Sequence, residues 1–212
     1  MADTPQARRE RERAELTELI LRGAREVFER DGHDGVSIRK VAKAIGYSPG
    51  TIYLYYKDKG ALMTALHEDA FFRERERFAP LMIVRDPMER LEAMGRTYIK
   101  SALERPSDFH LMFVDDCYIE SFRERGQEWY TNNGSFFLLV QTIQEGIDAG
   151  RFRENIEAES MAVTLWSMVH GYTTLALSGR LGMLPEERQR SAEDDMFAQV
   201  TKLLLPEPDD AG

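Results

Sequence analysis

Apolar residues recur at steps of three and four along most of the chain, which is the spacing of the buried face of an α-helix. The first stripe runs from Leu16 to Phe28. Gly32 is a suitable end for it, because glycine adopts the left-handed conformation that closes many helices. The sequence contains no alternating strand pattern and no internal repeat, so it predicts an all-α fold. Further helices are expected over residues 58–78, 88–102, 107–113, 118–129, 136–149, 157–180 and 196–204.

Two short helices are expected between the first stripe and residue 58. Ser37 can cap the first of them and Gly46 breaks it, while Ser48 followed by Pro49 can begin the second. Two short helices joined by a glycine turn form a helix-turn-helix, whose second helix can enter the major groove of DNA with its first residues against base edges. The apolar residues spaced to pack between the two helices are Val41, Ile45, Ile52 and Tyr55.

The charge of the chain is unevenly distributed. The formal net charge is −9, yet residues 1–60 carry 12 basic and 10 acidic side chains, and the remainder carries 16 basic and 27 acidic ones. Between Val36 and Lys59, five basic residues and one aspartate give a local net charge of +4, which favours contact with phosphates. The Tyr53 hydroxyl and the helix N-terminus near Ser37 can also donate hydrogen bonds to phosphate oxygens. We therefore expect double-stranded DNA as a partner.

The same segment contains the pattern I-x-x-V-A-x-x-x-G-x-S-x-G-T-I-Y-x-Y-Y, followed by K-x-x-L. The residues that carry it are Ile38, Val41, Ala42, Gly46, Ser48, Gly50, Thr51, Ile52, Tyr53, Tyr55, Tyr56, Lys59 and Leu62. In this pattern the chain resembles the tetracycline-repressor-like (TetR) regulators over residues 16–66. The resemblance implies that the DNA backbone is touched by Thr51, Tyr53, Tyr55 and Lys59. It also implies that bases or backbone are contacted by Arg39, Ser48, Pro49 and Gly50.

The resemblance further implies a DNA-binding domain followed by a helical sensing domain, and the sequence itself predicts an arm before them and a disordered tail after them. We expect an N-terminal arm over residues 1–15, a DNA-binding domain over 16–60, a helical effector-binding and dimerisation domain over 61–205, and a disordered tail over 206–212. Within the second domain, Trp166, His170 and Gly171 form a W-x-x-x-H-G stretch similar to that of one subgroup of the family. Because one recognition helix reads only a few base pairs, a homodimer is expected, with the helices over 136–149 and 161–177 at its interface.

A small, mostly apolar effector is expected to bind inside the second domain and to release a repressor from its operator. Aromatic and sulfur-containing side chains from several helices should converge there, and Tyr98, His170 and Tyr172 could supply polar groups. The alternative is that these side chains only fill the core. The predicted ligand-binding residues are Tyr98, Phe109, Met112, Phe113, Trp129, Phe137, Trp166, His170 and Tyr172.

Other kinds of site find little support in the sequence. His110, Asp115, Asp116 and Cys117 do not share one helical face, so we expect no metal, and no cofactor motif is present. The sequence lacks the common hydrolase, phosphate-loop and zinc-protease motifs, so an enzyme is not expected. A single cysteine, no secretory signal and no apolar run of about 20 residues indicate a cytoplasmic protein that does not span a membrane. Two alternatives stay open: an architectural DNA-binding protein without an effector and, more distantly, a helical ligand-binding enzyme.

Overall fold

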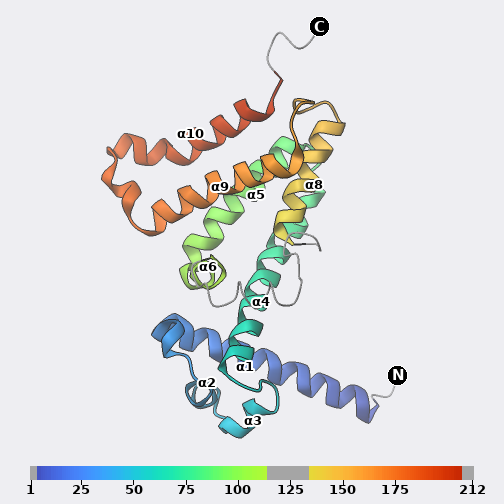
Figure 1. Cartoon of the computed structure of the whole chain (residues 1–212), viewed down its shortest axis with the longest axis vertical. Helices are drawn as coiled ribbons and strands as arrows, with labels where there is room; N and C mark the ends of the chain where they lie inside the picture. Colours follow the sequence, from blue (N-terminus) through green and yellow to red (C-terminus); the bar gives the residue numbers. More distant parts are fainter. Residues whose placement is uncertain (1–3, 114–133, 207–212) are drawn as a thin grey trace. The chain divides into compact units, whose positions relative to one another are not determined.

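Figure 1 shows the fold of the computed structural model, in which residues 4–113 and 134–206 are described. These residues form helices joined by short connections, and no strand occurs among them, so the all-α prediction is confirmed. The chain divides into two compact units. Of the described residues, unit 1 contains those up to Phe71 and those from His110 to Phe113, and unit 2 contains the rest. The helix expected over residues 118–129 lies outside the described residues.

The first helix, α1 (Pro5–Gly35), is longer than the apolar stripe predicted. It begins early because the Thr4 hydroxyl accepts a hydrogen bond from the Ala7 backbone N–H at 3.2 Å, and proline suits the first turn of a helix. The turns before Leu16 are mostly charged and exposed, so no apolar stripe marks them in the sequence. Near the predicted end, Gly32 has a left-handed φ of 68° that interrupts the helix.

Unit 1 is built around one core, to which α1, α2 (Ile38–Ile45), α3 (Pro49–Tyr53) and the beginning of α4 (Lys59–Phe78) contribute. Val41 and Ile52 are fully buried, and Ile45 and Tyr55 pack against the same core, as the helix-turn-helix prediction requires. The helices α1 and α2 approach so closely that a Cβ atom at Gly23 would overlap the Ile45 side chain. Glycine is therefore needed there for close packing rather than for an unusual backbone conformation.

The boundary between the units falls within α4, after Phe71, whereas a domain boundary after Gly60 is predicted from the sequence. The physical reason is the apolar face of the first turns of α4. Leu62, Leu66 and Ala70 are buried in the core of unit 1, so these turns fold with the helix-turn-helix.

Unit 2 contains the rest of α4 and a group of further helices around its own core. That core joins Leu91, Ile143 and Leu165 to Val200 and Leu204, which come from near the end of the chain. The last helix begins well before the predicted residue 196, because its first turns are exposed and offer no apolar stripe. The elements are η1 (Ala79–Ile83), α5 (Pro87–Glu104), the first residues of α6 (Pro106–Phe113), α8 (Ser135–Asp148), α9 (Ala158–Leu177), η3 (Arg180–Met183) and α10 (Glu186–Leu204).

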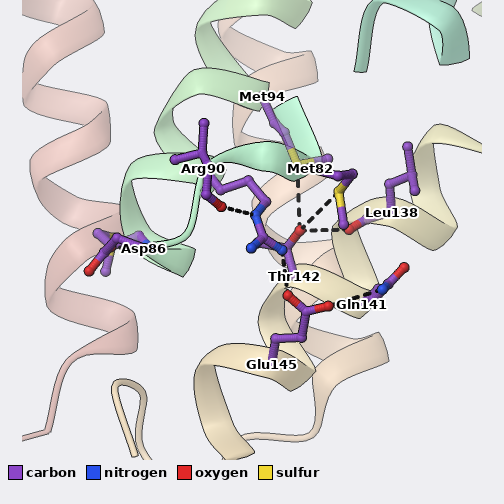
Figure 2. Close-up of polar contacts among 10 residues, drawn as sticks. Met82, Asp86, Arg90, Met94, Leu138, Gln141, Thr142 and Glu145 are labelled. Atoms are coloured by element: carbon purple, nitrogen blue, oxygen red, sulfur yellow. Dashed lines mark hydrogen bonds and ion pairs between the residues drawn. The ribbon is translucent and has the colours of Figure 1, made fainter. Parts of the chain in front are cut away.

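A buried arginine joins α5 to α8, as Figure 2 shows, and also to the connection that follows η1. Arg90 of α5 is 5% exposed. Its Nε donates to the Val84 carbonyl at 2.8 Å, and its Nη1 donates to the Glu145 carboxylate of α8 at 2.5 Å. Beside this pair, the buried Thr142 hydroxyl donates to the Leu138 carbonyl at 2.8 Å. The hydrogen bond from Arg90 lowers the pKa of Glu145, so the pair is charged at neutral pH.

We expect Arg90→Ala to lower the free energy of unfolding by about 2–3 kcal/mol, because the change removes buried packing and leaves the Val84 carbonyl without its donor. Urea denaturation followed by circular dichroism measures this. The matched control is Arg151→Ala, which removes an exposed ion pair with Asp86 and should change the free energy by less than about 1 kcal/mol. Equal effects of the two substitutions would contradict the role given to Arg90.

Candidate functional site

Each short helix of the helix-turn-helix is capped by a serine side chain. The Ser37 hydroxyl accepts from the backbone N–H three residues on at 3.3 Å, and the Ser48 hydroxyl accepts from the Thr51 N–H at 3.2 Å. Between the helices, Gly46 adopts a left-handed φ of 73°, which favours glycine. Ile52 is fully buried on the inner side of α3. Together these contacts determine where α3 begins and which side faces outward.

The outer side of α3 is open to solvent, and the Tyr53 side chain is 56% exposed. The predicted DNA-contacting residues that are exposed are Arg39, Ser48, Pro49, Gly50 and Tyr53. Those that are half-buried are Ser37, Thr51, Tyr55 and Lys59. Polar, small and aromatic side chains are thus presented on one short helix and its flanks.

The positive charge near α3 is only partly neutralised. Lys40 forms an ion pair with Asp31, with the two side-chain atoms 2.8 Å apart. Arg39, Lys43 and Lys57 are exposed and form no ion pair with any residue of the described ranges. These three cations flank α3 in the sequence, and unpaired surface cations of this kind are suited to phosphate groups.

Lys59 has a structural contact in addition to its predicted role. Its ammonium group donates to the His33 backbone carbonyl at 2.8 Å, so the start of α4 is joined to the last turn of α1. A phosphate contact by Lys59 is still a prediction. Substituting this residue would disturb the packing of unit 1 as well as any contact with DNA, so it is a poor choice for a mutational test.

Arg13 of α1 is a candidate that the sequence analysis missed. Its guanidinium carbon lies 5.4 Å from the centre of the Tyr55 ring, in a cation–π arrangement. The neighbouring Arg8 pairs with Glu12 at 2.8 Å, whereas Arg13 is exposed and pairs with no carboxylate in the parts of the chain described. Continuing the helical period backwards from Ile20 by seven residues would have placed Arg13 on the face that packs toward α3.

In unit 2, four of the predicted ligand-binding residues lie together. The Tyr98 hydroxyl is 2.8 Å from Nδ1 of His170, whose ring stacks on Phe109 with centroids 5.0 Å apart. The Trp166 ring centre is 6.0 Å from that of His170. Burial lowers the pKa of His170, which favours the neutral imidazole at pH 7. We call Tyr98, Phe109, Trp166 and His170 the aromatic cluster.

The other predicted ligand-binding residues lie elsewhere or are not described. Met112 packs against the core of unit 1, and the Phe113 ring lies 5.7 Å from that of Phe71, also in unit 1. Phe137 is exposed on α8, and Tyr172 is half-buried on α9. Trp129 lies outside the described residues. The part of the prediction that the fold brings together is therefore the aromatic cluster.

Glu74 of α4 is a second residue that the sequence analysis missed. It is 2% exposed, and its Oε2 atom accepts no hydrogen bond from any residue of the described ranges. Burial raises the pKa of Glu74 to about 7, against an opposing effect of Arg77. A signal was present in the sequence: Leu66, Ala70 and Phe78 occur at four-residue steps along the buried face of α4, and Glu74 occupies the remaining step.

Within residues 4–113 and 134–206, no group of three or more His, Cys, Asp or Glu side chains is arranged to hold a metal ion. Asp115, Asp116 and Cys117, considered above with His110, lie outside these ranges. None of the described helices combines the length and apolar character needed to span a bilayer.

Comparison with known proteins places both units in one family. Residues 20–66 match the family described as bacterial regulatory proteins, tetR family, and residues 91–198 match the tetracyclin repressor-like C-terminal domain. The chain is 28% identical to the HTH-type transcriptional repressor AcnR of Corynebacterium jeikeium over 199 residues. These aligned residues cover 90% of this chain and 93% of the relative. The AcnR of Corynebacterium diphtheriae is 25% identical over 185 residues, or 82% of this chain and 91% of the relative.

Solved structures agree with this fold. A TetR family transcription regulator from Marinobacter aquaeolei has a TM-score of 0.66 at 18% identity, covering 93% of this chain and all of that one. The fatty acid degradation regulator FadR from Bacillus halodurans has a TM-score of 0.60 at 16% identity, covering 87% of this chain and 97% of that one. Assignment to a W-x-x-x-H-G subgroup stays a prediction. The matches to both parts of the chain show that it belongs to the TetR family of bacterial regulatory proteins, which are transcription regulators and not enzymes.

Proposed function

We propose that this TetR-family regulator is a homodimeric repressor that binds an operator through α3 and leaves it when a small, mostly apolar molecule binds in unit 2. The observation that carries the proposal is the exposed outer side of α3, held by serine caps and the buried Ile52 and flanked by unpaired cations. The name of the AcnR relatives, transcriptional repressors, supports repression as the mode of action. Such a protein would act in the cytoplasm, where operator DNA is found.

In this proposal α3 lies in the major groove of the operator. Ser48, Pro49 and Gly50, at its start, would meet base edges, where short side chains allow the backbone to come close. The residues proposed to position the protein on phosphates are Ser37, Arg39, Thr51, Tyr53, Tyr55 and Lys59. Phosphate contacts set the register, whereas contacts to bases supply the preference for one sequence.

Arg13 should add one phosphate contact per protomer. We expect Arg13→Ala to weaken binding about 3- to 10-fold on every DNA sequence and to reduce the slope of log affinity against log salt by about 2 for a dimer. Fluorescence anisotropy at several salt concentrations measures both quantities. Arg8→Ala is the matched control, because Arg8 is already paired with Glu12, and it should change the slope less. An unchanged slope for Arg13→Ala would remove Arg13 from the interface.

The proposed dimer interface is the outer side of α8 and α9. From Ser160 to Gly179 the sequence contains no Asp, Glu, Lys or Arg, although many of these residues are exposed. Val163 and Leu175 are 50% and 43% exposed, and exposed apolar side chains on a helix without charged residues are typical of a protein–protein interface. Pairing two such faces about a two-fold axis would bury them and would present two copies of α3 to the two halves of an operator.

Release by an effector requires that the ligand prefer a state that cannot hold DNA. A preference of about 2–3 kcal/mol would lower operator affinity roughly 30- to 150-fold. The aromatic cluster is the proposed binding region, and α4 is the proposed lever, because it begins in unit 1 and continues into unit 2. A change in its tilt would alter the spacing of the two α3 helices in a dimer.

The test of the proposal is selection of fragments from a genomic DNA pool by the purified protein. A repressor should enrich a few fragments that share a short, two-fold symmetric sequence. An architectural DNA-binding protein would retain many fragments with no shared sequence. Retention of no fragment at low salt would overturn the proposal altogether.

A further inference from the structure

The interior of unit 2 holds a carboxyl group whose hydrogen-bonding capacity is not used within the described structure. Glu74 is almost completely buried, and Oε2 has no donor there. A buried acceptor without a donor is unfavourable by about 1–3 kcal/mol, and native proteins rarely keep one without a reason. The aromatic cluster lies near this carboxyl group, because Arg73, directly before Glu74, is paired at 3.3 Å with Asp108, directly before Phe109 of the cluster.

The charges around Glu74 favour one sign of ligand. Arg73, directly before Glu74 on α4, is paired with Asp108 at 3.3 Å, and the charge of Asp108 raises the pKa of Glu74. Arg77 opposes that effect but does not overcome burial. In the aromatic cluster, burial lowers the pKa of His170 and so favours the neutral imidazole. Arg77 acts on Glu74 only through its charge, because Oε2 accepts no hydrogen bond from the described residues. The region therefore offers a ligand an unused carboxylate acceptor and aromatic faces, which suits a positive group and disfavours an anion.

We infer that the effector is an organic cation, an apolar body bearing a protonated amine, whose ammonium group pairs with Glu74 beside the aromatic cluster. This inference rests on the proposed function, since it names the ligand class of the same region. The ammonium group would donate to Oε2 and supply the missing hydrogen bond. The faces of Tyr98 and Trp166 would cover the apolar body.

The experiment compares three probes that share one apolar body and differ in the head group: phenylbutylamine, phenylbutanol and phenylbutyrate. Isothermal titration calorimetry with the full-length protein should give an affinity for the amine at least about 10-fold higher than for the alcohol, with the carboxylate the weakest. Equal affinities for amine and alcohol, strongest binding of the carboxylate, or no binding of the amine at millimolar concentration would overturn the inference. This comparison needs no variant.

A variant pair then assigns the preference to one residue. Glu74→Gln removes the charge with little change in shape and should reduce the preference for the amine over the alcohol to less than about 2-fold. Its melting temperature should be unchanged or higher, because a neutral amide replaces a carboxyl group whose ionised form burial disfavours. Glu76→Gln, two residues away on the exposed side of α4, is the matched control and should keep the full preference. An unchanged preference in folded Glu74→Gln protein would contradict the pairing.

Operator binding measured on the same samples separates this inference from the proposed function. If wild-type protein binds the operator but has no higher affinity for the amine than for the alcohol, only the inference of a cationic effector is excluded. Preference for the amine with no effect on operator binding supports the cation site and removes release by the effector. Failure of wild-type protein to bind the operator in the absence of any probe removes the proposed function, whichever probe binds.

Discussion

A Gly50→Glu substitution is expected to reduce operator affinity by about 1000-fold or more while leaving unit 1 folded. An ideal Cβ atom at Gly50 approaches only the Ser48 hydroxyl, at an ordinary 3.6 Å, and the residue is exposed, so the protein can accommodate a side chain. A carboxylate in the first turn of a helix is also electrostatically favourable. In the complex, however, this carboxylate would face DNA, and like charges at an interface cost several kcal/mol.

The loss is large because a dimer carries the substitution twice. An unfavourable contribution of about 2 kcal/mol in each half-site gives about 4 kcal/mol in total, or about 1000-fold in affinity. Gly50→Gln has similar size without the charge and should lose much less. Gly182→Glu makes the same charge change in unit 2, where no described atom lies within 4 Å of an ideal Cβ atom, and should have no effect. Gel-shift titration with the selected operator measures the affinity of all three variants. Wild-type affinity of Gly50→Glu would exclude α3 as the recognition helix.

Val163→Arg is expected to convert the dimer into a monomer and to lower operator affinity by about 1000-fold. Val163 is half exposed near the start of α9, so an arginine there can remain hydrated in a protomer. In a two-fold interface, two such arginines would face an apolar surface and be buried without a partner, which is strongly unfavourable. A monomer keeps one α3 and retains mainly non-specific affinity, which for DNA-binding proteins is at least about 1000-fold weaker.

Leu103→Arg provides the matched control for the dimer. Leu103 of α5 is 46% exposed, close to the value for Val163, and the substitution makes the same chemical change on another helix. Light scattering should show a dimer for wild-type protein and Leu103→Arg, and a monomer for Val163→Arg. If the wild-type protein and both variants were dimers, α9 would be excluded as the interface. If all three proteins were monomers, the homodimer would be excluded.

The elements that follow local rules could be predicted from the sequence. Ser48 and Gly46 lie where the cap and the turn were expected, because a capping hydroxyl and a left-handed residue are chosen by neighbours only a few positions away. The buried positions Val41 and Ile52 followed from helical period alone. The start of α1 was placed too late, because exposed helical turns carry no apolar stripe and a single residue, Thr4, determines where they begin.

The candidate sites were less predictable, because they depend on contacts between distant parts of the chain. Tyr98 and His170 are 72 positions apart, and only the packing of α5 against α9 brings the hydroxyl to the imidazole. Phe113 and Met112 are aromatic and sulfur-containing like the other predicted ligand-binding residues, yet the fold places them in unit 1. The residue type of Glu74 predicts a surface position, because carboxylates are rarely buried, whereas its spacing along α4 predicts the buried face on which it lies.

Sequence-specific recognition by α3 is tested most directly by comparing the affinity of the protein for its selected operator with that for a scrambled duplex of the same length and composition. Fluorescence anisotropy at physiological salt should give an operator affinity at least about 1000-fold higher, a difference that Gly50→Glu should remove. Both duplexes should bind more weakly as salt rises, because phosphate contacts are common to the two. Equal affinity for operator and scrambled duplex in the wild-type protein would contradict a sequence-specific regulator and favour an architectural DNA-binding protein.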